Sequence, residues 1–354
     1  MFWLATGSVI RGELPQAREV TTTLLGLAEA RKDRPMLINA IRGLGMIQLF
    51  MGNVVGARGL TERAVETFTA SNEAEKLAAR AAGQDAGASA LALMSWALWV
   101  LGQADTAAAR MAAALERANT VKHPHTQAYV CYYASILHAL RGESAIARQY
   151  AERCLTLSEE HGFRHWQGIS RAVRGICTAA LGASPSALKE AMEALGEYRG
   201  AGYRLGITAL DVLLCPALLL DNQPEAALDV IERGLSIASH NGERIFEAEL
   251  DRLKARALLF RGEPGAGTQA QSLLEQALTT ARSQHARSLE LRTAKDLAAL
   301  WIEQGRRDEA LALLAPIHAW FTEGLDTPDL KEAKTLLDQL QGCSDAVHLG
   351  RLSS

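Results

Sequence analysis

Histidine and cysteine side chains in the middle of this 354-residue sequence have types and spacings that could support metal chemistry. His161 and His165 lie four residues apart beside Glu160, with Cys154 one helical stretch earlier. Imidazole, thiolate and carboxylate groups at such spacing can bind zinc. Gly162 lies between the two histidines, however, and predicts a turn that separates the rings. We therefore expect a solvated turn here and no metal site.

Two further pairs could be reactive. His123 and His125 flank Pro124, and a proline at this position favours the start of a helix. Cys131 and His138 would need an orienting third group to act as nucleophile and base, and they lie two helical turns apart in an apolar segment. A buried thiol that packs as a small hydrophobic side chain is the prediction for that cysteine.

Motifs for nucleotide binding are missing from the sequence. A Walker-type phosphate loop needs Gly-Lys followed by Ser or Thr, and no Gly-Lys dipeptide occurs. The glycine-rich run at Gly262–Gly267 lies between expected helices, whereas a dinucleotide fingerprint would follow a strand. We therefore expect no catalytic residues, no metal and no cofactor, and a chain that is not an enzyme.

The composition predicts a folded cytoplasmic protein. It is 48% hydrophobic and 22% charged, and its five cysteines form no Cys-x-x-Cys pair, which predicts reduced thiols. A net charge of -3 gives no general attraction to nucleic acid or to an anionic membrane surface. The longest uncharged stretch, residues 86–104, contains Gly, Ser and Gln and predicts a buried helix, so we expect neither nucleic acid nor a membrane as partner.

The elements that position all these residues repeat along the chain. A glycine followed five residues later by alanine recurs about every 40 residues, which predicts two helices joined by a tight turn. Asp221 with Ala226 fits the same frame, and at Gly262 the insertion 263–267 displaces the next helix. The pattern occurs at Gly12/Ala17, Gly52/Ala57, Gly102/Ala107, Gly142/Ala147, Gly182/Ala187 and Gly305/Ala310.

A second, weaker punctuation at Gly162, Gly202 and Gly242 marks where each hairpin passes to the next. Between the turns the apolar residues follow helical spacing, and no stretch shows strand alternation. This pattern resembles the tetratricopeptide repeat (TPR) with lengthened helices. The resemblance implies an all-α, TPR-like α-solenoid, a right-handed superhelix of about eight hairpins; the alternative is a globular helical enzyme with accidental periodicity.

The two ends of the expected solenoid differ. Before Gly12 there is room for only a short first helix, so the first hairpin is predicted to be truncated, whereas Thr327 and Pro328 begin a C-terminal capping helix. We expect residues 1–341 to form the solenoid and residues 342–354 a flexible tail. Self-association is expected through the uncapped N-terminal end, with its apolar residues Phe2, Trp3, Leu4, Val9 and Ile10.

Three segments carry a more specific resemblance: GQDAG at 83–87, LHALRGE at 137–143 and WFTEGLDTPDLKEAK at 320–334. They resemble the C-terminal helical region of bacterial regulators that join a class III adenylate cyclase domain, a signalling ATPase domain and TPR-like repeats. The match covers roughly residues 10–340, although Ala86 replaces the usual proline. It implies a sensor or regulatory region for signal transduction, without the cyclase and ATPase domains.

In TPR domains the first helix of each hairpin lines a concave groove. Counting back three, six, ten and thirteen residues from the turn glycine gives aromatic residues in the N-terminal half and charged residues in the C-terminal half. We expect a protein or peptide, or an ATPase or cyclase domain, to bind this groove, unless the rings are core residues. The positions are Trp96, Trp99, Tyr129, Tyr132, Asp211, Glu249, Arg252, Arg256, Arg292 and Lys295.

Two functions from different classes remain open. The first is a non-catalytic protein-interaction scaffold that resembles the sensor region of a cyclase or ATPase signalling protein. The alternative is a small-ligand sensing domain, for a metabolite or sugar, of a transcriptional or signalling regulator. The residues alone do not decide between them.

Overall fold

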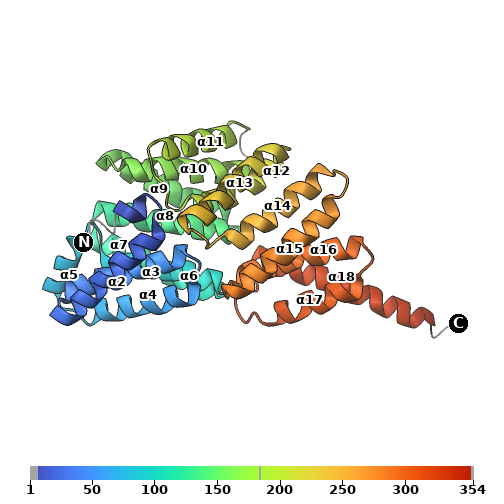
Figure 1. The fold of residues 1–354 in the computed structure, drawn as a ribbon, viewed down its shortest axis with the longest axis horizontal. Helices are drawn as coiled ribbons and strands as arrows, with labels where there is room; N and C mark the ends of the chain where they lie inside the picture. Colours follow the sequence, from blue (N-terminus) through green and yellow to red (C-terminus); the bar gives the residue numbers. More distant parts are fainter. Residues whose placement is uncertain (1–6, 183–184, 352–354) are drawn as a thin grey trace.

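Antiparallel helical hairpins make up the whole computed structural model, which describes residues 7–182 and 185–351, with the side chains of 7–182 and 186–341 (Figure 1). No strand occurs in these ranges, so the prediction of an all-α, TPR-like solenoid is confirmed. The helices are α2 (Leu14–Arg31), α3 (Arg34–Phe50), α4 (Val54–Thr69), α5 (Glu73–Arg80), α6 (Ala86–Val100), α7 (Ala104–Val121), α8 (Pro124–Leu140), α9 (Ser144–His161), α10 (Arg164–Ala180), α11 (Pro185–Gly200), α12 (Ile207–Leu220), α13 (Pro224–Asn241), α14 (Glu247–Arg261), α15 (Ala266–Ser283), α16 (Arg287–Glu303), α17 (Arg307–Ala319) and α18 (Pro328–Arg351).

The predicted turn glycines have left-handed backbone conformations, but two positions of the repeat differ from the prediction. Asn222, with φ of 57°, makes the turn that the sequence assigned to Asp221. Asparagine tolerates this conformation, and the partner five residues on is the fully buried Ala227. After the insertion, Gly265 with φ of 84° and the buried Ala270 restore the five-residue spacing.

The turns between hairpins are more regular than their glycines indicate. Gly162, Gly202 and Gly242 have positive φ as predicted, and Lys32, Lys122 and His285 have positive φ at equivalent places without glycine. The ten-residue excess before Gly102 forms the additional short helix α5, between α4 and α6.

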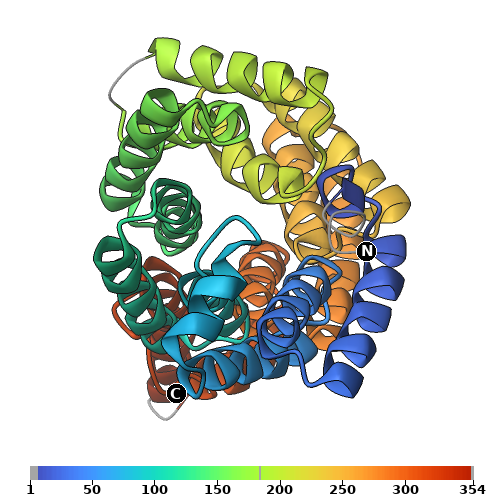
Figure 2. The ribbon, with the colours of Figure 1, turned by 90° about the vertical axis from the view of Figure 1, so that its left-hand side faces the viewer.

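The solenoid winds tightly enough for its later helices to contact its earlier ones (Figure 2). We call α2–α11 the first turn and α12–α18, with the loop 201–206 before them, the second turn. Backbone N–H groups of Arg204 and Ile245 donate to the carbonyl oxygens of Ile10 and Phe50, each over 3.1 Å. Four hairpin glycines of the first turn face second-turn residues: Gly12 faces Asn241, Gly52 faces Gln284, Gly102 faces Trp320 and Gly142 faces Pro328.

The two chain ends are packed on the solenoid to different extents. Helix α18 begins at Pro328 as predicted and buries its apolar stripe through Leu330, Ala333, Leu337 and Leu340. It continues to Arg351, and the flexibility predicted for 342–354 stays a prediction.

At the N-terminus, Val9 is buried against Ala17 and Ile47, so it is not part of a free apolar face, whereas Ile10 is 39% exposed. Phe2, Trp3 and Leu4 lie outside the described residues, and self-association stays a prediction.

Candidate ligand-binding chamber

The ten predicted groove residues do not line an open groove, because the second turn packs against the first turn along much of the expected surface. A partner segment could reach most of them only if the two turns separated. Asp211 is fully buried beside Arg199, and burial raises the pKa of Asp211 to about 6. Arg256 is exposed, Arg292 and Lys295 are half-buried, and the remaining seven are at most 5% exposed: Trp96, Trp99, Tyr129, Tyr132, Asp211, Glu249 and Arg252.

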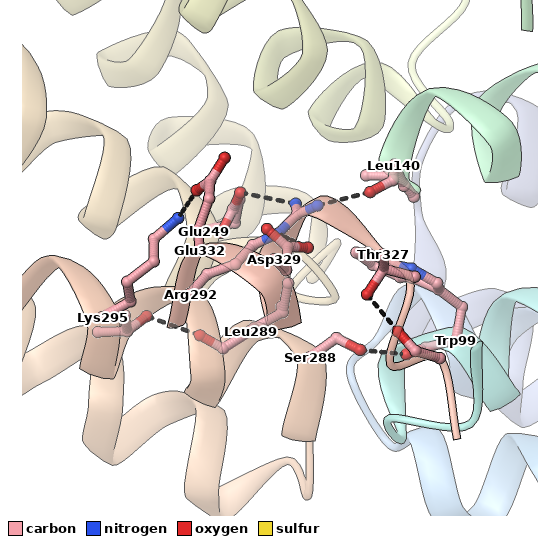
Figure 3. Close-up of polar contacts among 12 residues, drawn as sticks. Trp99, Leu140, Glu249, Ser288, Leu289, Arg292, Lys295, Thr327, Asp329 and Glu332 are labelled. Carbon is pink, nitrogen blue, oxygen red and sulfur yellow. Dashed lines mark hydrogen bonds and ion pairs between the residues drawn. The ribbon is translucent and has the colours of Figure 1, made fainter. Parts of the chain in front are cut away.

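Most of the predicted charged residues pair with one another and with α18 inside the second turn, and Arg292 also donates to the Leu140 carbonyl oxygen in the first turn (Figure 3). Arg292 pairs with Glu249 over 3.1 Å and with Asp329 over 2.8 Å. Burial raises the pKa of Glu249, but the charges of Arg252 and Arg292 outweigh burial and hold that pKa at about 2. Lys295 also pairs within the chain, with Glu332. In this structure Arg292, Glu249 and Lys295 therefore bind other residues of the same chain.

Two of the predicted rings, Tyr129 and Tyr132, border a cavity of about 660 Å³ inside the first turn, which we call the chamber. Volumes of this size are typical of small-molecule sites. Its walls come from α2, α3, α8, α10 and α11 and from Val9 and Ile10, and the loops before α6, α10 and α12 border it. Chain segments more than 150 residues apart therefore share one space.

Aromatic rings form two platforms on the chamber wall. In the first, Tyr129 stacks on Tyr133 with centroids 4.6 Å apart and meets the edge of Trp166 at 5.6 Å. In the second, Tyr198 stacks on Tyr203 at 4.9 Å. Rings in such arrangements present flat apolar faces, and Tyr hydroxyls add hydrogen-bonding capacity at their edges.

Four buried polar atoms at the chamber wall have no hydrogen-bond partner: Asn39 Oδ1, Arg42 Nε, His125 Nδ1 and the Tyr129 hydroxyl. Asn39 is held by its other amide atom, because Nδ2 donates to the carbonyl oxygens of Pro35 and Ala79. Buried polar atoms are almost always paired in folded proteins. Four unpaired atoms around one cavity therefore indicate a site prepared for a polar ligand.

The protonation of the chamber histidines follows from their neighbours. Trp166 donates its indole N–H to Nε2 of His125 over 3.1 Å, and burial lowers the pKa of His125. Since an indole nitrogen only donates, the neutral imidazole carries its proton on Nδ1 and presents a donor there. Burial lowers the pKa of His165 to about 4, so this ring is also neutral at pH 7.

The region around His161 and His165 differs from the predicted solvated turn. His161 is exposed, but His165 is enclosed by Trp166, Tyr198 and Tyr203. The turn glycine between the two histidines leaves only His165 inside the chamber. Across the described ranges, no group of three His, Cys, Asp or Glu side chains could hold a metal ion.

The other two histidine and cysteine predictions are confirmed. Pro124 is the first residue of α8, and His123 is its N-cap. Cys131 is 1% exposed, as expected for a thiol packed in the core.

Sequence reasoning missed Arg42 and Asn39, although its own rule contained the signal. Counting back ten and thirteen residues from Gly52 reaches these two positions on α3. The same count from Gly142 reaches Tyr129 and Tyr132 on α8, so these four side chains occupy equivalent inner positions of two hairpins.

Comparison with known proteins identifies the fold. No model of a known protein family matches the chain, and no curated protein matches its sequence. The Rap protein complexed with competence and sporulation factor is 14% identical, with a TM-score of 0.54 over 92% of this chain and 80% of that one. The apo form of RapI is 16% identical, with a TM-score of 0.50 over 78% and 95%.

Yeast Tom70 is also similar in structure, with 13% identity and a TM-score of 0.45 over 96% of this chain, which spans 62% of the Tom70 chain. At these identities the likeness concerns the fold, which is TPR-like. No helix in the described part of the chain is both long and apolar enough to cross a bilayer.

Proposed function

We propose that this chain is a non-catalytic regulatory scaffold whose first superhelical turn encloses a small ligand. The observation that carries this function is the chamber of about 660 Å³ with four unpartnered buried polar atoms on its wall. TPR-like solenoids are built to present binding surfaces, and here the inner surface is closed into a pocket of small-molecule size.

Ligand binding in the chamber can change the shape of the solenoid. Val9 and Ile10 line the chamber next to Leu205 and Gly206, where the second turn begins, and the Arg204 N–H donates to the Ile10 carbonyl oxygen at this junction. A ligand that contacts both segments stabilises this junction relative to an opened one by its differential affinity. Ligand binding in the chamber can therefore change the position of the second turn relative to the first turn.

A chamber-filling variant tests this function. Met46 lines the chamber, whereas Met192 is 38% exposed on the outer helix α11. In thermal unfolding with a panel of sugars, nucleosides, amino acids and aromatic acids, at least one compound should raise the midpoint of the wild type and of Met192→Trp. The same compound should not stabilise Met46→Trp. No stabilising compound, or equal stabilisation of both variants, would contradict the proposal.

A protein partner is a second candidate function, favoured by the hairpin edges that the second turn leaves uncovered. At Gly182, Gly262 and Gly305 no described atom lies within 4 Å of a Cβ placed on the glycine, whereas Gly12, Gly52, Gly102 and Gly142 are covered. Leu181, Leu220 and Phe260, at or near the ends of helices beside these open turns, are 45%, 80% and 50% exposed.

The resembled regulators make an ATPase or cyclase domain the partner to test at this edge. Two of the segments that carry the resemblance, 137–143 and 320–334, lie where the two turns are in contact. Pro328 packs on Gly142, and the Gly324 N–H donates to Asp105 over 2.8 Å. Binding of a recombinant ATPase domain from such a regulator should be weakened by Leu220→Glu with Phe260→Glu. Leu77→Glu, 62% exposed on α5, is the control. Equal binding by all variants would exclude this edge.

A further inference from the structure

We infer that the chamber selects a small carboxylate that carries a flat ring, and that Arg42 binds the carboxylate. This inference rests on the proposed function and defines the chemical class of its ligand. It goes beyond the cavity itself, because it assigns one side chain to the charge of the ligand and the aromatic platforms to its body.

The charge distribution of the chamber requires a negative ligand group. None of the described residues that line it is an aspartate or glutamate, and Arg42 and Arg164 are its positively charged side chains. Arg42 is only 6% exposed, its Nε has no hydrogen-bond partner and no carboxylate of the described chain pairs with it; its guanidinium lies beside the Tyr129 hydroxyl, whereas Arg164 is exposed. A guanidinium removed from water without a counter-charge is costly, and a bound anion removes that cost.

One buried guanidinium balances one negative charge, which favours a carboxylate over a phosphate dianion. The planar guanidinium fits two carboxylate oxygens, as arginine commonly binds them. The Tyr129 hydroxyl, which lies beside the Arg42 guanidinium, and the Nδ1–H of His125 make no hydrogen bond of good geometry and can donate to the same group. Asn39 Oδ1 can only accept, so it suits an N–H or O–H group elsewhere on the ligand.

The body of the ligand is inferred from the two aromatic platforms. Tyr129, Tyr133 and Trp166 surround one side of the chamber, and the stacked pair Tyr198 and Tyr203 surrounds another. Flat rings gain both apolar burial and favourable ring contacts on such walls. A ring-bearing acid therefore matches the chamber in shape and charge.

Indole-3-acetate and its amide are matched probes, because they differ in charge but have nearly the same shape. By titration calorimetry, the wild type should bind the acid about tenfold more tightly than the amide, or better, since charge-assisted hydrogen bonds are the strong ones. Arg42→Gln should abolish this preference and leave the affinity for the amide within about twofold. Arg164→Gln is the control for general electrostatic attraction and should keep most of the preference.

The possible outcomes separate the ligand class from the proposed function. Equal binding of acid and amide by the wild type, or an unchanged preference in Arg42→Gln, would overturn the inference. Failure of both probes would also overturn it, and the proposed function would still stand if another panel compound stabilised the wild type but not Met46→Trp. If no compound bound or stabilised the wild type, both the inferred ligand class and the proposed function would be contradicted.

The stability of the ligand-free protein gives an independent readout for Arg42. An unpaired buried cation destabilises the folded chain, so the unfolding midpoint of Arg42→Gln without ligand should equal or exceed that of the wild type. Arg42→Lys, which keeps the charge but lacks the bidentate geometry, should retain part of the acid preference. A lower midpoint for Arg42→Gln would indicate a structural role and contradict the assignment.

Discussion

Arg292 on α16 donates a hydrogen bond to the backbone carbonyl oxygen of Leu140 at the end of α8, 152 residues earlier in the chain (Figure 3). The same guanidinium pairs with Glu249 and Asp329 and lies 5.0 Å from the ring centroid of Trp99. One side chain therefore joins the two superhelical turns: its ion pairs fix it within the second turn, and its contacts with the Leu140 carbonyl oxygen and the Trp99 ring reach the first. We refer to these five residues as the inter-turn clasp.

Removing the Arg292 charge should open the clasp. In Arg292→Gln, Glu249 stays buried with less compensating charge, and breaking such a pair costs about 3 kcal/mol of unfolding free energy. Lys295→Gln is the matched control, since its partner Glu332 is 61% exposed and the loss should stay below about 1 kcal/mol. Urea unfolding measures both, and equal losses would argue against a clasp.

The contact between turns at Gly102 can be tested separately from backbone strain. Gly102 and Gly305 have φ of 89° and 79°, so alanine is strained at either position by about 1–2 kcal/mol. Only at Gly102 would the new Cβ lie 2.7 Å from Trp320 and 2.9 Å from Phe321, and overpacking adds about 1–3 kcal/mol. Gly102→Ala should therefore lose more stability than Gly305→Ala in urea unfolding and should raise the radius of gyration in solution scattering. Identical behaviour of the two variants would show that the turns are not held at this point.

The hairpins could be predicted from sequence because their determinants are local. A left-handed glycine and an alanine five residues later act within one turn and one helix contact. The same reasoning failed at Asp221, where Asn222 makes the turn, and it missed Lys32 and Lys122, since non-glycine residues adopt the same conformation in the fold. A rule based on residue type cannot detect such positions.

The inner surface could be predicted only in part, because its exposure depends on how tightly the superhelix winds. The groove positions do face inward, yet Trp99 and Glu249 are buried between turns while Tyr129 borders the chamber. Small differences in hairpin packing accumulate over several repeats and decide which inner positions meet another turn. No single repeat contains that information.

Glu243 should make the stability depend on pH near neutrality. Burial raises its pKa to about 7, although N–H groups of Gly206 and Thr208 and the Thr208 hydroxyl donate to it. Because the folded pKa exceeds the unfolded value, the stabilising contribution is complete below the unfolded pKa and is lost as pH rises through 7. Between pH 6.5 and 8 the unfolding free energy should fall by about 1 kcal/mol from this group.

The variant Glu243→Gln cannot ionise and should flatten the profile in this interval. Asp211, with a pKa raised to about 6, and His165, with a pKa lowered to about 4, act mainly at lower pH. Glu116→Gln, at an exposed position on α7, should keep the wild-type slope. Urea unfolding at four pH values measures the slopes, and an unchanged slope in Glu243→Gln would assign the effect to another group.

The thiols of the described helices should be unreactive while the chain is folded. Cys131, Cys154, Cys177 and Cys215 are at most 1% exposed, and burial raises the pKa of Cys131 to about 11 and that of Cys154 and Cys177 to about 12. The thiolate is the reactive form, so these residues are protected both because a reagent cannot reach them and because their thiols stay protonated. In a Cys343→Ser background, reaction with a disulfide reagent at pH 8 should be slow and should accelerate with urea.

A positive control gives the scale for that measurement. Leu220→Cys in the same background places one thiol at a position where the native side chain is 80% exposed, and this thiol should react rapidly in the folded protein. Fast labelling of two or more native cysteines would mean that α8, α9 and α10 open readily. Since α8 and α10 also form the chamber wall, such opening would conflict with a preformed ligand site.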